Sequence, residues 1–576
     1  MAWETITQLR AAYLAKQTTP EAEVNRIIEQ AQVDRDYNIW ISAPAKSQIE
    51  PFLARLAKLD PKEAPLWGIP FAVKDNIDVQ GYETTAGCPD YAYMPEKSAT
   101  VVDRLVAAGA IPIGKTNLDQ FATGLVGTRS PYGETKNGCN PSYISGGSSS
   151  GSAVAVARKQ VLFALGTDTA GSGRVPASVH GLIGWKPSIG AWPTTGVVPA
   201  CASIDCVTVF THTIEDAYKI DKVVRGLDSD DPFSKMSMPL AVGEPTRYIL
   251  PKKESLRFYG PHATAFEEAW EASVSLLETQ EAQVDFIDTA LLAEAASLLY
   301  DGPLVAERWA AVGAFIDRHP QAAFPVTEKV IRTGQTYDAA ALFTAQHKLK
   351  AIKRDVWNCL GENSVLMMPT NGGTYTREEV RESPISTNND MGLYTNHCNL
   401  LDLCAIAVPG AKQADGLPFG ITFFAPHDGE HLVIGAAAAW SNACEPKAII
   451  AVCGLHMRGF PLEPEMHKHR AVFKEEARTA PAYKLARLPG EVAKPGLIKQ
   501  NSGGSAIELE LWEMPQSELG RFLATIPAPL GLGKLKLSDG REVIGFICEG
   551  AAAEEAEEIT AFGGWRKAMA ARRIKS

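Results

Sequence analysis

Two glycine- and serine-rich turns and one lysine carry the most reactive groups in this sequence. The first turn is GGSSSG at 146–151, and the second, GTDTAGSGR, contains Ser172, 24 residues after Ser148. Lys74 stands upstream in the strand-like run FAVKD. A glycine-rich turn presents backbone N–H groups beside a hydroxyl, which supplies an oxyanion pocket for a serine nucleophile. With lysine as the base, the pattern predicts acyl transfer on serine.

The base must be neutral, and this requirement predicts where Lys74 lies. At an ordinary pKa near 10.4, only about one lysine in a thousand is neutral at pH 7.4. Burial and contact with other donors must therefore lower its pKa by about three units. Because FAVKD is mostly apolar, we expect Lys74 to be buried.

Two other motif matches have the wrong context. Residues 147–151 fit the GxSxG nucleophile elbow, with Ser149 as nucleophile, but that elbow needs a strand leading into it, and 140–143 (NPSY) is typical of a turn. Residues 109–116 match the phosphate-binding GxxxxGK[ST], which should follow a strand and open a helix. Here its first glycine ends a helix, and Pro112 lacks the N–H that a phosphate cradle uses. We expect neither function.

The chain of 576 residues is long enough for several domains. It is 45% hydrophobic and 21% charged, which excludes disorder, and its net charge of −11 argues against a nucleic-acid or anionic-membrane surface. The first residues lack a secretory signal, and no apolar run approaches the roughly 20 residues of a membrane span. The ten cysteines form no CxxC pair. We expect a soluble cytoplasmic protein with free thiols, no metal and no cofactor.

Hydrophobic spacing predicts the elements that position the reactive residues. Residues 1–60 have helical periodicity, and from Trp67 onward short β-like runs alternate with helical ones. Residues 262–360 are predicted as a helical layer, and strands are expected again at 365–370, 405–410 and 416–425. Such alternation predicts an α/β fold with a mixed β-sheet covered by helices.

The composition changes after Cys444-Glu445-Pro446, which we interpret as a linker. Short apolar strands and the hairpin signal Asp539-Gly540 then predict a small, β-rich α+β domain. We therefore predict two domains, 1–446 and 447–576.

Over roughly residues 60–440 the chain resembles the amidase signature family, most specifically in SGGSSSGSAVAVA and LGTDTAGSGRVPA. The resemblance implies that family's fold and its catalytic set of a lysine, a serine in a cis peptide and a nucleophilic serine. Matched position by position, these are Lys74, Ser148 and Ser172. It also implies an oxyanion hole made by the backbone amides of Thr169, Ala170, Gly171 and Ser172. A bracing ion pair between Asp168 and Arg174 is implied as well.

Within that family, the segments 119–133 and 395–410 are similar to the allophanate hydrolase subfamily. The resemblance implies a small anionic substrate, allophanate, with Arg308 and Tyr300 binding its carboxylate and Gly124 lining the pocket. Tyr300 precedes Arg308 by eight residues. On one continuous helix, that spacing would put the two side chains about 80° apart, facing one pocket.

The C-terminal domain is similar to that of allophanate hydrolases and, more distantly, to the γ-glutamylcyclotransferase-like fold. The cyclotransferases use a glutamate in a Leu-Glu-Gly context, which is missing here, so we do not expect their activity. The resemblance leaves a turn carrying His456 in a domain expected to help N-carboxycarbamate lose carbon dioxide.

Other functions stay open on the sequence alone. The alternatives are an amidase for larger amides or a glutaminase-type subunit of the same family, and a non-enzymatic scaffold that binds a biotin-dependent carboxylase. The resemblance further implies a homodimer and a functional link to urea carboxylase.

Overall fold

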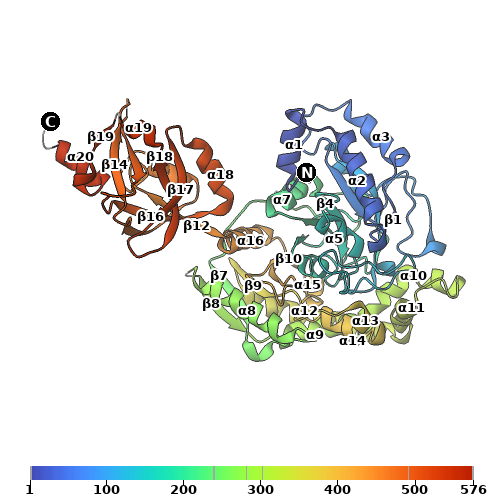
Figure 1. Cartoon of the computed structure of the whole chain (residues 1–576). Helices are drawn as coiled ribbons and strands as arrows, with labels where there is room; N and C mark the ends of the chain where they lie inside the picture. Colours follow the sequence, from blue (N-terminus) through green and yellow to red (C-terminus); the bar gives the residue numbers. More distant parts are fainter. Residues whose placement is uncertain are drawn as a thin grey trace. The chain divides into compact units, whose positions relative to one another are not determined.

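The structure is a computed structural model that describes residues 3–237, 240–280, 282–300, 302–490, 492–554 and 556–573. It divides into two compact units, Met1–Ser441 and Asn442–Ser576 (Figure 1). The division falls within helix α16 (Glu430–Cys444). The boundary at 446/447 stays a prediction.

The larger unit is built on one mixed sheet, as predicted. In its described residues the sheet has eleven strands in the order β1-β3-β2-β4-β6-β5-β10-β11-β9-β7-β8. β2 pairs in parallel with both β3 and β4, whereas β4 and β6 are antiparallel. The strands are β1 (Trp40–Ser42), β2 (Pro70–Lys74), β3 (Ile111–Thr116), β4 (Phe163–Asp168), β5 (Ile183–Lys186), β6 (Cys206–Thr211), β7 (Arg247–Pro251), β8 (Gln283–Ile287), β9 (Ser364–Pro369), β10 (Leu403–Pro409) and β11 (Gly420–Pro426).

Helices cover this sheet (Figure 1), and every residue of β2, β3 and β4 is buried. Strands buried on both faces read as continuous apolar runs, which is why these three were predictable. The helices of the unit are α1 (Ile6–Leu14), α2 (Pro20–Val33), α3 (Lys46–Leu56), α4 (Thr100–Ala107), α5 (Ser150–Ala157), α6 (Arg174–Ser178), α7 (Ile214–Val224), α8 (Ala263–Glu278), α9 (Ala290–Tyr300), α10 (Ala306–Arg318), α11 (Pro325–Arg332), α12 (Ala339–Leu360), α13 (Arg377–Glu382), α14 (Ser386–Met391), α15 (His397–Leu400) and α16.

Two short strands lie where only helices were predicted. β1 falls within residues 1–60 and pairs with β3, and β8 falls within 262–360 and pairs with β7. They are the two edge strands of the sheet. A three- or five-residue edge strand carries little periodicity of its own and is selected by its pairing partner.

The motif at 109–116 has the context that we expected. Its last six residues form β3, and Lys115 is buried 3.5 Å from the carboxylate of Asp75. Because Lys115 lies inside a strand and is paired with Asp75, this motif does not form a phosphate-binding loop.

The prediction that Tyr300 and Arg308 share one helix is wrong. α9 ends at Tyr300, Gly302 is extended (φ −136°, ψ 178°), and Pro303 begins a 3-10 turn before α10. A residue preceding proline is driven away from the helical region, so the chain breaks there. The 80° relationship therefore does not hold.

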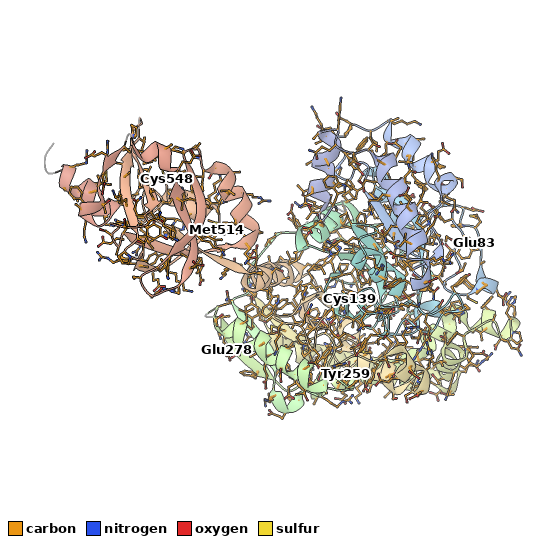
Figure 2. All side chains as sticks on the ribbon, viewed as in Figure 1. Glu83, Cys139, Tyr259, Glu278, Met514 and Cys548 are labelled. Atoms are coloured by element: carbon orange, nitrogen blue, oxygen red, sulfur yellow. The ribbon has the colours of Figure 1, made fainter. Side chains whose placement is uncertain are left out.

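The smaller unit is β-rich, with a five-stranded sheet, β13-β16-β12-β18-β17, and a three-stranded sheet, β15-β14-β19, in its described part. Its core includes Trp512, Phe522 and Trp565. Figure 2 shows its side chains, with Met514 and Cys548 labelled. The strands and helices are β12 (Lys447–Val452), α17 (Glu463–Lys468), β13 (Val472–Arg478), β14 (Tyr483–Leu488), β15 (Lys494–Lys499), β16 (Glu508–Pro515), α18 (Gln516–Thr525), β17 (Leu530–Lys536), β18 (Glu542–Cys548), α19 (Gly550–Glu554), β19 (Glu557–Glu558) and α20 (Trp565–Arg573).

Two sequence expectations, the hairpin and the free thiols, have a local counterpart. β17 and β18 form the antiparallel hairpin predicted at Asp539-Gly540, where the glycine takes a positive φ of 93°. All ten cysteines are free. Among the described residues, no helix combines the length and apolar character needed to cross a lipid bilayer.

Candidate active site

Lys74 and Ser148, 74 residues apart in sequence, are in direct contact. Lys74 ends β2, is 0% exposed, and donates hydrogen bonds from Nζ to Ser148 Oγ (2.8 Å) and Thr167 Oγ1 (2.7 Å). β4 carries Thr167 beside β2 because the two strands pair in parallel. Sequence analysis missed Thr167, since a threonine in a buried strand gives no separate signal.

The pKa of Lys74 is lowered from 10.5 to about 7. The largest cause is burial, which penalises the charged ammonium, and the positive charge of Arg308 acts in the same direction. The carboxylates of Asp119, Asp205 and Asp168 oppose the shift. At neutral pH about half of the Lys74 side chains are thus neutral, which is the state that a base requires.

Ser148 lies in the turn that precedes α5, and the Gly147–Ser148 peptide bond is cis. The Ser148 carbonyl accepts a hydrogen bond of 3.0 Å from the N–H of Asp119. The Asp119 carboxylate in turn accepts hydrogen bonds from the backbone N–H groups of residues 126, 127 and 129. A Cβ on Gly147 would collide with that carboxylate, so this position requires glycine. Asp119 therefore holds the loop beside Ser148.

Ser172 lies in the turn between β4 and α6 and is 3% exposed. The N–H of Gly171 donates to Asp168 Oδ1 (2.7 Å) and that of Gly173 to Asp168 Oδ2 (3.0 Å). Within the described ranges, no hydrogen bond is formed by the N–H groups of Ala170 and Ser172. The prediction of Gly171 as an oxyanion donor is thus not supported, because its N–H is already committed to a carboxylate.

The expected ion pair between Asp168 and Arg174 is present and fully buried. Arg174 Nε and Nη2 lie 2.9 and 3.0 Å from the two oxygens of Asp168. This fork is the strong, planar form of the interaction. It fixes the carboxylate that also accepts the two glycine N–H groups, so the turn is braced from inside.

The positive charge of Arg308 acts on Lys74, and Gly124 lies beside Asp119, whose charge also acts on that lysine. Arg308 is 1% exposed, and its Nη1 donates to Thr123 Oγ1 at 2.9 Å. A Cβ on Gly124 would come within 2.6 Å of Asp119 Oδ2, so the chain passes that carboxylate closely. Leu299 packs in one apolar cluster with Ala170, whereas the side chain of Tyr300 lies outside the described residues.

His456 belongs to the other unit and lines a cavity of about 350 Å³. Its Nε2 lies 3.1 Å from Glu465 Oε2, and its ring stacks on Phe546 with centroids 4.9 Å apart. Burial lowers the pKa of the imidazole, which favours the neutral ring. Lys494 also lines the cavity and brings a cation to it.

Comparison with known proteins supports the relationship that these residues suggest. The urea amidolyase of Saccharomyces cerevisiae is 39% identical over 571 residues, covering 92% of this chain and 31% of that protein. This chain thus spans about a third of that relative's length. The structure of Kluyveromyces lactis allophanate hydrolase is 36% identical, covers 99% of both chains and superposes with a TM-score of 0.73.

A more distant relative is one of the subunits of the glutamyl-tRNA(Gln) amidotransferase from Picosynechococcus, 31% identical over 68% of this chain and 89% of that protein. The family model described as "Allophanate hydrolase C-terminal domain" matches residues 448–570. The model described as "Amidase" matches residues 21–434, more than half of the sequence, and the chain therefore belongs to the amidase family.

Proposed function

We propose that this chain is an allophanate hydrolase that uses Ser172 as nucleophile and Ser148 and Lys74 as its proton relay. The observation that carries the proposal is the 2.8 Å contact between Lys74 Nζ and Ser148 Oγ, together with a lysine pKa of about 7. A buried amine of this kind is neutral often enough at physiological pH to act as a base.

In the proposed mechanism, Ser172 Oγ attacks the amide carbonyl of the substrate while its proton passes to Ser148, whose own proton passes to Lys74. The resulting oxyanion accepts hydrogen bonds from the N–H groups of Ala170 and Ser172. Within the described residues, these two N–H groups have no other acceptor. Thr169 stays a predicted third donor. The proton returns along the same path to the leaving nitrogen, the C–N bond breaks, and ammonia departs. Water then cleaves the acyl-enzyme with Lys74 as base again.

The anionic substrate is supported by Arg308. This cation is buried near Lys74, and an arginine fork suits a planar carboxylate better than it suits a neutral amide. We propose that Arg308, Tyr300 and Gly124 contact the carboxylate end of allophanate. The overall step converts allophanate and water to N-carboxycarbamate and an ammonium ion.

We propose that the C-terminal unit carries the second step, in which N-carboxycarbamate loses carbon dioxide. Lys494 and His456 around one cavity support this role, because the lysine cation attracts a small dianion and a neutral imidazole can exchange a proton with it. The carbamate that remains breaks down to ammonia and carbon dioxide.

Ammonia release from allophanate by the wild-type protein, Ser172→Ala and Ser149→Ala tests the proposal. Ser149 is the matched control, because its hydroxyl donates to the Thr167 carbonyl (3.0 Å) and has no role in the mechanism. We expect background activity from the first variant and near-wild-type activity from the second. The reverse result would reassign the nucleophile to the elbow motif, and a neutral amide used as well as allophanate would favour a general amidase or glutaminase.

The partners are also proposals. We propose a homodimer and a functional link to a biotin-dependent urea carboxylase in the cytoplasm. The similarity to a urea amidolyase about three times as long as the matched region supports the link. Sedimentation of the purified protein, and its co-purification with the carboxylase, test the two assemblies.

A further inference from the structure

Asp205, a buried carboxylate that the motifs did not identify, ties the oxyanion turn to a neighbouring loop. It directly precedes β6 and is 5% exposed. Its Oδ1 accepts a hydrogen bond from the hydroxyl of Thr169, the first residue of the turn. Its Oδ2 accepts the N–H groups of Ala200 (2.8 Å) and Cys201 (3.1 Å). One side chain therefore fixes Thr169 against two backbone amides.

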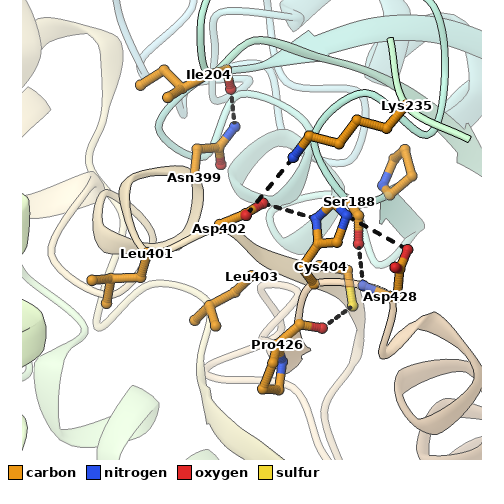
Figure 3. A network of polar contacts seen from close by, with 12 residues as sticks. Ser188, Ile204, Lys235, Asn399, Leu401, Asp402, Leu403, Cys404, Pro426 and Asp428 are labelled. Carbon is orange, nitrogen blue, oxygen red and sulfur yellow. Dashed lines mark hydrogen bonds and ion pairs between the residues drawn. The ribbon is translucent and has the colours of Figure 1, made fainter. Parts of the chain in front are cut away.

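A second contact holds the same two segments together. The amide nitrogen of Asn399 donates to the carbonyl of Asp168 (2.7 Å) and to that of Ile204 (2.8 Å), the latter drawn in Figure 3. Asp168 and Ile204 are the chain neighbours of Thr169 and Asp205. Since the backbone is bridged beside the carboxylate, Asp205 has little freedom to move away from the turn.

Asp205 also acts on Lys74 through its charge. Three carboxylates raise the pKa of Lys74: Asp119 after β3, Asp168 at the end of β4, and Asp205; Arg308 on α10 lowers it. Burial raises the pKa of Asp205 itself to about 6, while the Thr169 hydroxyl and Arg308 oppose that rise. Asp205 is therefore mostly ionised at the pH where Lys74 titrates.

We propose that Asp205 is a positioning residue for the proposed hydrolysis: its carboxylate orients Thr169 and the donors that follow it, and its charge acts on the base Lys74. The inference rests on the proposed function. It assigns a structural cause both to the placement of the oxyanion donors and to the pH at which the enzyme becomes active.

The test compares wild type, Asp205→Asn and Thr169→Val in ammonia release from allophanate between pH 5 and 9. Asp231→Asn is the matched control, because Asp231 is buried and lines one cavity of about 200 Å³ together with Asp205, but accepts its hydrogen bonds from Thr194 and the N–H of Phe233. We expect Asp205→Asn to lower kcat at pH 9 at least tenfold with little change in KM. The acid limb of its pH profile, the range in which kcat falls as pH decreases, should shift to lower pH. Loss of the negative charge at Asp205 lowers the pKa of Lys74 and so favours the neutral lysine.

Thr169→Val separates the two effects. It removes the hydroxyl but keeps the Asp205 carboxylate, which is ionised at pH 9, so kcat at pH 9 should fall while the acid limb shifts less than it does in Asp205→Asn. The double variant should be no worse than the more damaged single variant, because both break the same link. An Asp205→Asn profile that matches Asp231→Asn in both kcat and acid limb would overturn the inference. A wild-type protein inactive on allophanate would instead refute the proposed function.

Discussion

Lys74 Nζ lies 2.8 Å from Ser148 Oγ, so the proposed base and the proposed relay share a hydrogen bond. Here β2 brings the lysine to the turn before α5, and Thr167 on β4 holds the same nitrogen at 2.7 Å. Two adjacent strands thus position the Lys74 amine, so that proton transfer between Ser148 and Lys74 requires no movement of either side chain.

The first prediction concerns pH. Because the neutral form of Lys74 is required and its pKa is about 7, kcat/KM should be level above pH 8 and fall about tenfold per unit below pH 6. The measurement is ammonia release under kcat/KM conditions between pH 5 and 9. A profile still rising steeply at pH 9 would mean that the lysine keeps an ordinary pKa, and burial would then not explain the activity.

The second prediction links the same group to stability. The folded pKa of Lys74 is below the unfolded value of 10.5, so the unfolded chain binds more protons between pH 7 and 10.5. Its contribution to the free energy of unfolding therefore rises with pH in that window and is constant below it. Between pH 7 and 9 the stability of wild type relative to Lys74→Met should increase by about 2 kcal/mol.

Denaturant unfolding of both proteins at the two pH values measures that difference. Titrating groups that do not interact with Lys74 contribute equally to the two proteins and cancel in the comparison. A difference that does not change with pH would show that Lys74 is protonated to the same extent in the folded and unfolded chains.

The third prediction concerns substrate choice. Arg308→Ala should lower kcat/KM for allophanate about a hundredfold, a loss of about 3 kcal/mol expected for a hydrogen-bonded carboxylate. Biuret, which has an amide in place of the carboxylate, should lose less than tenfold. Both are measured at pH 9, because removing the arginine charge also raises the pKa of Lys74.

Thr123→Val is the control for that experiment. It removes the 2.9 Å partner of Arg308 but keeps the positive charge, so the preference for allophanate over biuret should survive. An equal loss for the two substrates in Arg308→Ala would show that the arginine supports the fold and does not select the carboxylate.

Much of the site was accessible from sequence because its reactive residues stand in glycine-rich turns and one apolar strand. Lys74 was predicted to be buried, and the family resemblance implied that Ser148 belongs to the same catalytic set. Asp119 and Asp205 were missed, since each is a single acid whose partners are backbone amides brought together only by folding. The break after Tyr300 was misjudged, although Gly302-Pro303 was a visible stop signal.

The fourth prediction concerns the buried ion pair. Asp168→Ala leaves the Arg174 guanidinium without its two carboxylate oxygens, at 0% exposure, and should cost about 3–5 kcal/mol of unfolding free energy. The N–H groups of Gly171 and Gly173 lose their acceptor as well, so activity should vanish. Thermal and denaturant unfolding measure the loss. Glu271→Ala, which breaks an exposed pair with Lys253, should leave the transition unchanged.

The last prediction separates the two units by the order of their products. If His456 serves the decarboxylation, His456→Ala in the full chain should release the first ammonia at the wild-type rate, while carbon dioxide should lag behind it. The imidazole lies against Glu465 and Phe546, so its removal enlarges the cavity within the smaller unit. His467 is an exposed side chain on α17, and His467→Ala should show no lag.

Stopped-flow detection of ammonia and carbon dioxide from one sample measures the lag between the two products. Simultaneous release by His456→Ala would remove the C-terminal cavity from the chemistry and leave decarboxylation to proceed in solution.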